Sequence, residues 1–424
     1  MPVVVFFLDA LDPKECVDFL SDTKQGRVIS GVPRVTPSVM GSFLTGKDPG
    51  EHGLVRPTPL YKPFMQRPKG DTIIDLVARR GRVFSYLMPF TMGINPPNSI
   101  IAQAGMGEEA NIPYAVLMMP QVNFDMVTTE PERILHSFID HVRNICATSR
   151  QLIRNNRADV YFISIREIDS FTHYCYQGDY RQRLIEYIAM ELQEFSIMGN
   201  DMSILWWSDH GSCPKTGRFE INRWLIDKGY LKINYLEKRH KVMLDRLQED
   251  GEKVYRDQVG VQTPFVEIED GSKFVSADMF DSCVDVLGDV SDSEIEKLRE
   301  ELMATGHFKA VYRKYELFKN CNGDIPEIIP DRKDGLLVSG NVHPRAEAED
   351  CVSVVSERTG DHAPYGCFGG NIDFKSDVGD IYPWDLFTIV DELTQDLKTE
   401  SKVEALTPAE EAQILKGLER KGYA

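Results

Sequence analysis

The chain has 424 residues, enough for one large domain with an insertion or for two to three domains. Its 66 acidic residues outnumber the 48 basic ones and give a net charge of -18, which argues against binding nucleic acid or an anionic membrane through a basic surface. A small anionic substrate is compatible with this charge if metal ions supply local positive charge.

The eight cysteines are spread widely along the chain, and no Cys-x-x-Cys pair occurs. This spacing favours free thiols in a reducing compartment over a disulfide framework. The first apolar stretch, 3–8, lacks a basic leader and is too short to span a bilayer, so it is interpreted as a buried strand. We therefore expect a cytoplasmic protein without membrane association.

Short apolar runs alternate with helical patterns along the first half of the chain. Runs rich in β-branched and aromatic residues predict buried strands at 3–8, 83–88, 159–165 and 201–207. Cap residues or apolar residues at helical spacing predict helices at 71–81, 131–156 and 180–198. The alternation predicts an α/β fold, a mostly parallel central sheet with helices on both faces, and in such sheets active residues collect beyond the carboxyl ends of the strands.

The pattern changes after about residue 236. The stretch 237–328 is charged and broken, with one clear helix at 291–306, and is interpreted as an inserted cap region. The catalytic core then comprises 1–236 and 329–398, closed by a helix at 385–397. Residues 399–424 are predicted to form a C-terminal helical tail, since Thr407, Pro408 and Glu410 make up a capping box.

Side chains that can bind metal follow three of the predicted strands, and one more lies in a late Gly-rich segment. These residues are Asp9, Asp169, His173, Asp209, His210 and His362. A lone Asp after a strand is more often a turn or cap residue, and a lone His is usually a surface residue. Here, however, residues that can bind metal follow three different strands, and a chance placement would have to occur three times in one chain. Mixed carboxylate and imidazole ligands suit a borderline divalent ion such as Zn²⁺.

Thr36 lies at the start of an apolar stretch and directly before Pro37, a residue typical of the first helical position. Thr36 is therefore a natural helix N-cap. The same place also suits catalysis, because backbone N–H groups at a helix N-terminus hold a phosphoryl group. A hydroxyl bound to a divalent metal loses its proton more readily and becomes a nucleophile. The residues alone leave both roles open.

Together these motifs resemble those of the type I phosphodiesterase/nucleotide pyrophosphatase group within the alkaline phosphatase superfamily. The shared pattern is an Asp after the first strand, a Thr nine residues before Thr-Gly, then Pro, His-Gly, Asp with His, Asp-His-Gly and a late Gly-x-His. It is carried here by Asp9, Thr36, Thr45-Gly46, Pro49, His52-Gly53, Asp169, His173, Asp209-His210-Gly211, Gly360 and His362. The order and spacing match over almost the whole chain.

The resemblance implies an alkaline phosphatase-like fold and a site with two divalent ions, Zn²⁺ or alternatively Mn²⁺. It implies one metal site of Asp169, His173 and His362, and another of Asp9, Asp209 and His210 with Thr36. Thr36 would be the nucleophile and would form a phosphothreonine intermediate. The implied activity is hydrolysis of phosphodiester or pyrophosphate bonds in a small phosphorylated substrate, with nucleotides among the candidates.

Two positions depart from the family pattern. Ser38 stands where the family usually has Pro, which makes it a rival nucleophile to Thr36. Pro57 stands where the animal-type pyrophosphatases carry an Asn, and Arg56 is either its replacement as a phosphate contact or a salt-bridge residue. His52 is expected to stabilise a turn rather than to bind metal.

Other functions remain as alternatives. A phosphomonoesterase or phosphomutase would share the two-metal core, and a non-catalytic protein could bind a phosphorylated ligand. A sulfatase is disfavoured, because the segment from Thr36 to Met40 lacks the Cys or Ser in the setting that its nucleophile needs. A diester is favoured over a monoester, since near the nucleophile only Arg34 and Arg56 could neutralise an extra phosphate charge.

Overall fold

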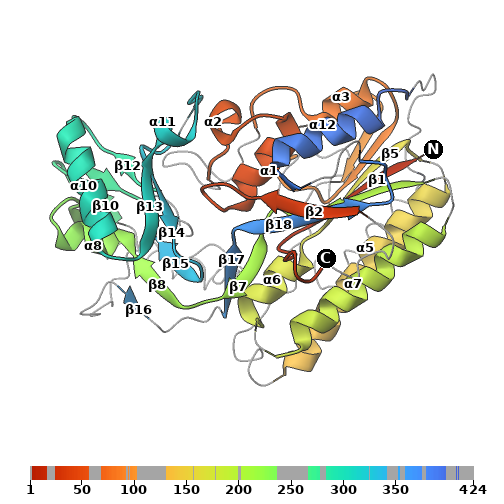
Figure 1. Cartoon of the computed structure of the whole chain (residues 1–424), viewed down its shortest axis with the longest axis horizontal. Coiled ribbons are helices and arrows are strands. Elements are labelled where there is room, and N and C mark those ends of the chain that lie inside the picture. Colours follow the sequence, from red (N-terminus) through yellow and green to blue (C-terminus); the bar gives the residue numbers. More distant parts are fainter. Residues whose placement is uncertain are drawn as a thin grey trace, which may run out of the picture. The chain divides into compact units, whose positions relative to one another are not determined.

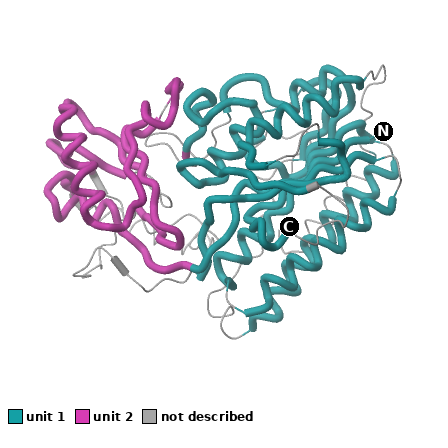
Figure 2. The backbone as a smooth tube through the Cα atoms, viewed as in Figure 1, with its two compact units in different colours: residues 1–55, 65–214, 357–424 teal, residues 56–64, 215–356 magenta. Residues whose placement is uncertain are grey.

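The computed structural model describes residues 2–16, 24–56, 68–91, 94, 96–102, 130–155, 157–176, 178–198, 202–235, 266–276, 283–323, 325–340, 352–353, 359–374, 379–397, 407 and 409. The chain divides into two compact units (Figure 2). Unit 1 comprises Met1–Val55, Met65–Pro214 and Glu357–Ala424, and unit 2 comprises Arg56–Phe64 and Lys215–Ser356.

Unit 1 is built on an eight-stranded sheet in the order β19-β2-β18-β6-β1-β5-β3-β4 (Figure 1). Its strands are β1 (Val3–Leu8), β2 (Lys24–Ile29), β3 (Val83–Tyr86), β4 (Ser99–Ala102), β5 (Val160–Ile165), β6 (Ser203–Trp207), β18 (Tyr365–Gly370) and β19 (Asp380–Ile381). Within this sheet only β18 runs antiparallel to its neighbours. The predicted α/β class with a mostly parallel central sheet is therefore confirmed.

Helices cover both faces of this sheet, as Figure 1 shows. One face carries α5 (Pro131–Arg154), α6 (Glu167–Tyr174) and α7 (Tyr180–Ile197), and the other carries α1 (Thr36–Thr45), α3 (Ile73–Ala78) and α12 (Pro383–Leu393). The short helix α2 (Pro49–His52) follows α1, and a separate hairpin pairs β7 (Gly211–Pro214) with β17 (Gly360–Ala363).

The central strand β1 is fully buried because its alternate side chains enter two different cores. Phe6 packs edge-on against Phe195 of α7, with ring centroids 4.9 Å apart. Phe7 faces the other way and contacts Trp207, which in turn packs against Phe43 of α1. This two-sided burial fixes the register of β1 between β5 and β6, and with it the position of the residue that follows the strand.

Unit 2 has smaller sheets around its own apolar core. Its elements are β8 (Gly217–Glu220), α8 (Ile221–Asp227), β9 (Ile233–Tyr235), β10 (Val266–Ile268), β11 (Phe274–Val275), β12 (Asp285–Val286), α10 (Asp292–Ala304), β13 (Phe308–Arg313), α11 (Lys314–Leu317), β14 (Ile328–Arg332), β15 (Leu336–Ser339) and β16 (Val352–Ser353). Phe219, Trp224 and Leu298 are among the residues of this core. The bounds of unit 2 are wider than 237–328, so the inserted cap region as delimited from sequence stays a prediction.

Several local expectations have clear outcomes. The helix predicted at 71–81 begins with Thr72 as the N-cap of α3, because the Thr72 side chain accepts the Asp75 N–H. The expectation that all the cysteines are free thiols is wrong for Cys16 and Cys367, which form a disulfide across 351 residues of sequence. The predicted C-terminal tail, 399–424, lies almost wholly outside the described residues.

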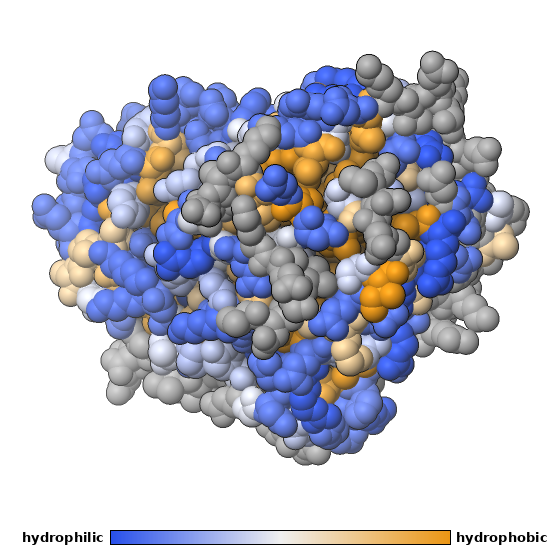
Figure 3. Space-filling view, turned by 45° about the vertical axis from the view of Figure 1, so that its right-hand side comes forward, coloured by the Kyte–Doolittle hydropathy of each residue, from blue (hydrophilic) through white to orange (hydrophobic). Residues whose placement is uncertain are grey.

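The surface agrees with the acidic, polar composition. Hydrophilic residues predominate on the face drawn in Figure 3, with apolar side chains gathered in smaller patches. None of the helices in the described ranges is long and apolar enough to cross a membrane.

We predict that Gly370→Ala destabilises the fold. A Cβ at Gly370 in β18 would lie 2.1 Å from the backbone carbonyl oxygen of Ile204, so the paired strands would have to separate. Overpacking of this kind costs about 1–3 kcal/mol and should lower the melting temperature by several degrees. Gly379→Ala is the matched control, since nothing lies within 4 Å of its added Cβ. Equal melting temperatures for the two variants would contradict the tight β18–β6 approach.

Candidate metal centre

The candidate ligands come from the carboxyl ends of neighbouring strands in unit 1. Asp9 directly follows β1, Asp209 and His210 lie between β6 and β7, and Asp169 and His173 lie on α6, just beyond β5. His362 is on β17, which pairs with β7 so that His362 is opposite Ser212. Because β1 is hydrogen-bonded to both β5 and β6, its end lies between theirs.

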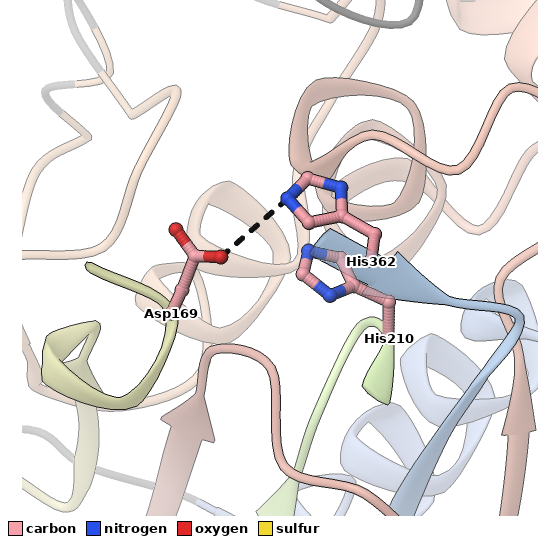
Figure 4. Close-up of side chains that lie close together, drawn as sticks. All are labelled: Asp169, His210 and His362. Atoms are coloured by element: carbon pink, nitrogen blue, oxygen red, sulfur yellow. Dashed lines mark ion pairs between the residues drawn. The ribbon is translucent and has the colours of Figure 1, made fainter. Parts of the chain in front are cut away.

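Two groups of these side chains are close enough to hold a metal ion. Potential ligand atoms of Asp169, His210 and His362 lie within 4.8 Å of one another, and so do those of Asp9, Asp209 and His210. Figure 4 shows Asp169 facing the two imidazoles, which lie one over the other with ring centroids 3.8 Å apart. His210 belongs to both groups, so the two candidate sites are adjacent.

His173 adjoins the first group. Its Nε2 atom lies 3.2 Å from Asp169 Oδ1, one helical turn away on α6. The ligand pairing that the family resemblance implies places His173, rather than His210, with Asp169 and His362. Both arrangements are compatible with these distances, and the pairing stays a prediction.

Backbone carbonyls orient all three imidazoles in the same way. Nδ1 of His173, His210 and His362 faces the carbonyl oxygens of Gly360, Gly211 and Arg34 at 3.2, 3.0 and 2.9 Å. A carbonyl only accepts hydrogen bonds, so Nδ1 carries the proton in each ring. Nε2 is then the atom with a lone pair for a metal, which is the tautomer arrangement typical of histidine ligands.

The charges of the site are strongly perturbed by burial. Burial raises the pKa of the Asp9 carboxyl well above its usual range, and the neighbouring Asp209 and Asp169 raise it further. Burial also raises the pKa of Asp209 to about 6, although His362 opposes the shift. The pKa of His210 falls to about 4, chiefly through burial. Carboxylates packed this closely repel one another unless a cation lies between them.

The donor set fits divalent cations. Asp9 Oδ1, Asp169 Oδ1 and His210 Nε2 are fully buried atoms without a hydrogen-bond partner. Buried polar atoms of this kind are rare and call for an explanation, such as an ion. Oxygen and nitrogen ligands from Asp and His match Zn²⁺, and Mn²⁺ accepts the same carboxylates. The residues present therefore fit the implied metals.

Thr36 does not cap its helix. The structure makes Val35 the N-cap and Thr36 the first residue of α1, with no side-chain capping hydrogen bond, so the predicted capping role is wrong. The Thr36 hydroxyl instead lies near Asp209, where its hydrogen bond is among the influences that lower the pKa of that carboxyl against the larger effect of burial. The hydroxyl is therefore beside the candidate ligands.

Sequence reasoning missed Arg166. Its Nε lies 3.4 Å from Asp9 Oδ2, and its side chain is 35% exposed, so a positive charge lies beside the acidic cluster. Arg166 directly follows a predicted strand, and this position in the sequence could have identified it as a residue of the site.

Other candidates have different surroundings. Arg56 forms a buried ion pair with Asp285 at 2.6 Å within unit 2. His52 is fully buried, and its ring contacts Ser42 Oγ and the N–H of Leu54, as expected of a residue that stabilises the turn after α2. Pro57 lies outside the described residues.

A family model described as type I phosphodiesterase/nucleotide pyrophosphatase matches residues 18–362. The chain belongs to this family. It is accordingly a hydrolase of phosphoric ester bonds of the phosphodiesterase/nucleotide pyrophosphatase type. A comparison with curated protein sequences finds no match.

Solved structures share the fold over nearly the whole chain. Phosphonoacetate hydrolase from Sinorhizobium meliloti 1021, in complex with phosphonoformate, is 14% identical with a TM-score of 0.59 and covers 93% of this chain and 96% of its own. Murine ectonucleotide pyrophosphatase/phosphodiesterase 5 is 12% identical with a TM-score of 0.54, covering 95% and 97%. The human protein is 13% identical, with the same TM-score and coverage. At these identities the likeness shows the fold alone.

We predict that His210→Ala reduces zinc binding at both candidate sites, because His210 is shared by the two groups. Zinc should raise the melting temperature of the unaltered chain, since a ligand present at 100 times its Kd stabilises the folded state by about 2.7 kcal/mol. In His210→Ala the zinc-dependent rise should shrink and the zinc content should fall. His136→Ala is the control, because that exposed imidazole on α5 lies outside both groups. Equal zinc stoichiometry and affinity in the two variants would contradict the assignment.

Proposed function

We propose that the chain is a metal-dependent phosphohydrolase that cleaves phosphodiester or pyrophosphate bonds through a phosphothreonine intermediate on Thr36. The observation that carries the proposal is the position of Thr36. Its hydroxyl is not used as a helix cap and lies near Asp209, within a cluster of buried Asp and His side chains from three strand ends. A nucleophile and cation ligands in one place are what phosphoryl transfer requires.

Two divalent ions, Zn²⁺ or alternatively Mn²⁺, are the proposed cofactors. The proposed ligands are Asp169, His173 and His362 for one ion, and Asp9, Asp209, His210 and Thr36 for the other. When bound, the two ions would supply positive charge that stabilises the phosphoryl oxygens and makes the attacking hydroxyl more acidic.

The chain's own residues perform the rest of the chemistry. Thr36 is at the N-terminus of the ten-residue helix α1, where backbone N–H groups and the helix dipole favour a negatively charged phosphoryl group. In the first step the Thr36 Oγ–P bond forms, the bond from phosphorus to the leaving oxygen breaks, and in the net reaction the hydroxyl proton ends on that leaving oxygen. In the second step water attacks phosphorus, the Oγ–P bond breaks, and Thr36 regains its hydroxyl.

The proposed substrate is a small phosphorylated molecule, with nucleotides among the candidates. Two similar structures hold small phosphorus-containing anions: the phosphonate phosphonoformate in the phosphonoacetate hydrolase, and the nucleotide AMP in an inactive variant of the murine phosphodiesterase. The proposed compartment is the cytoplasm, on the basis of the wide cysteine spacing. The Cys16–Cys367 disulfide is the observation against that compartment.

We predict that Thr36→Ala lowers kcat by at least about 1,000-fold, because removal of a nucleophile eliminates the covalent route. Stability should change by less than about 1 kcal/mol, since the Thr36 side chain makes no capping bond. Ser38→Ala, two residues further along α1, is the matched control and should keep kcat within about threefold of the original. If Ser38→Ala is inactive and Thr36→Ala is active, the nucleophile is Ser38.

A phosphomonoesterase remains the second candidate, and Arg166 favours it. A monoester carries more negative charge at phosphorus than a diester and benefits from an additional cation. Besides Arg34 and Arg56, Arg166 adds a positive charge near the candidate ligands, since its Nε lies 3.4 Å from Asp9 Oδ2. The Arg166 guanidinium already faces the Asp9 carboxylate, so little of its positive charge is left to stabilise a substrate phosphate. The diester proposal is therefore retained.

We predict a higher kcat/KM for a bis(nitrophenyl) phosphate diester than for the matching nitrophenyl monoester. The acidic chain disfavours approach of a dianion, and the ratio of kcat/KM values reports differences in transition-state stabilisation directly. A dinucleotide with a pyrophosphate link and a nitrophenyl sulfate complete the panel. A tenfold or greater preference for the monoester would overturn the diesterase assignment and leave the metal sites intact. Absence of hydrolysis with every phosphoester, by zinc-loaded protein, would favour a non-catalytic phospholigand-binding role.

A further inference from the structure

Arg181, on α7, is a buried cation outside the candidate ligand set. The residue is only 5% exposed, and its guanidinium contacts several segments at once. Nε donates to Thr172 Oγ1 at 2.7 Å, and Nη2 donates to the Ala10 carbonyl oxygen at 3.0 Å and to Ser212 Oγ at 3.1 Å. Nη1 forms an ion pair with Glu15. One planar group thus joins the segments that follow β1, β5 and β6.

Each neutral acceptor of Arg181 is close in sequence to a candidate ligand. Ala10 follows Asp9, Thr172 precedes His173, and Ser212 lies two residues after His210. Two of the three acceptors are also linked directly, because Ser212 Oγ donates to the Ala10 carbonyl oxygen at 2.9 Å. Removal of the guanidinium would break the hydrogen bonds that join Thr172 to the segments of Ala10 and Ser212, and would leave only the direct bond between those two.

The backbone at Ala10 shows what these hydrogen bonds hold in place. Ala10 has a φ of 68°, in the left-handed region that residues with a side chain disfavour by about 1–2 kcal/mol. Its carbonyl oxygen accepts two hydrogen bonds, from Arg181 and from Ser212. These bonds help to maintain a strained turn directly after Asp9.

A buried guanidinium is a costly way to obtain stability alone. Desolvation of a charge costs several kcal/mol, and apolar side chains of similar volume often stabilise a fold equally well. Burial lowers the pKa of Arg181 to about 10, which shows how strongly the protein interior opposes its charge. The forked guanidinium does, however, offer five N–H donors in a fixed plane, which a lysine ammonium cannot reproduce.

We propose that Arg181 is a positioning residue for the metal centre, which holds the segments after β1, β5 and β6 so that Asp9, His173 and His210 meet in a metal-binding geometry. The inference rests on the proposed metal-dependent function. Hydrogen bonds behind metal ligands commonly change metal affinity or activity by 10–100-fold. Arg181 acts on the residues next to ligands in both sites, so its loss should affect both ions.

The test compares Arg181→Met with Arg150→Met in the full chain. Arg150 is a suitable control because it also forms a largely buried ion pair with α7, through Glu191 at 2.6 Å, and its hydrogen bonds within the described part of the chain go to Glu191 rather than to a candidate ligand. The measurements are the melting temperature, the Kd and stoichiometry of Zn²⁺, and the visible absorption spectrum with Co²⁺, which reports ligand geometry.

Arg181→Met should weaken at least one Zn²⁺ site about 10–100-fold and change the Co²⁺ spectrum. Arg150→Met should lower the melting temperature and leave the Zn²⁺ Kd within about twofold of the original value. Arg181→Lys keeps the charge beside Glu15 but lacks the fork, so it should restore at most part of the affinity. If Arg181→Met loses stability but binds Zn²⁺ and Co²⁺ as the unaltered chain does, the inference is overturned.

A second variant covers the case in which Arg181→Met does not fold. Thr172→Val preserves the shape of the side chain and removes only the acceptor of the Arg181 Nε bond. It should weaken the affinity for the Zn²⁺ ion at the site of His173 by at least about fivefold. An unchanged Kd for that ion would contradict the inference. The failure of the proposed function gives a different result: unaltered protein that binds two metal ions but hydrolyses no phosphoester overturns the activity and leaves the Arg181 comparison valid. Unaltered protein that binds neither Zn²⁺ nor Co²⁺ overturns both.

Discussion

The mutual repulsion of buried carboxylates is the constraint on which this site depends. Asp9 and Asp209 are fully buried, and each lies close enough to Asp169 for that carboxylate to raise its pKa further after burial itself has done so. Ordinary core packing does not place three acidic groups together at such an electrostatic cost. The backbone pairing of β5, β1 and β6 forces them together, and divalent cations are the simplest compensation.

Core packing and hydrogen bonds hold the residues of this acidic cluster in fixed positions. Within the sheet, alternate side chains of β1 enter two separate cores, which fixes the register of the strand. Around the ligands, the protons on Nδ1 of the three histidines are directed to backbone carbonyls, which leaves each Nε2 for the centre. Ser30 adds a further restraint, because its hydroxyl donates to the carbonyl oxygen of Asp209 at 2.7 Å. Hydrogen bonds to backbone carbonyl oxygens thus link the candidate ligands directly to the main chain of the fold.

Much of the architecture could be predicted from local sequence pattern. The runs at 3–8 and 159–165 are continuous apolar strands because both their faces are covered. Candidate ligands could be proposed because Asp9 directly follows the first strand, and Asp169 and His173 lie on the helix just beyond the second. The disulfide could not be predicted, since Cys16 and Cys367 are 351 residues apart. The N-cap of α1 could not be predicted either. Only the tertiary structure brings the Thr36 hydroxyl near Asp209, so that this hydroxyl does not cap a backbone N–H of the helix. Arg181 looks like any arginine of an amphipathic helix until the fold brings Ala10, 171 residues away, to its guanidinium.

The central claim is that the ends of β1, β5 and β6 form a site for two divalent ions. The most direct test is a crystal of the zinc-loaded protein, measured with X-rays on both sides of the zinc absorption edge. The account predicts two anomalous peaks in unit 1, one beside Asp169 and His362 and one beside Asp9 and Asp209, each at about 2.0–2.2 Å from its ligand atoms. Protein that remains fully folded in excess zinc and shows no anomalous peak at these side chains would contradict it.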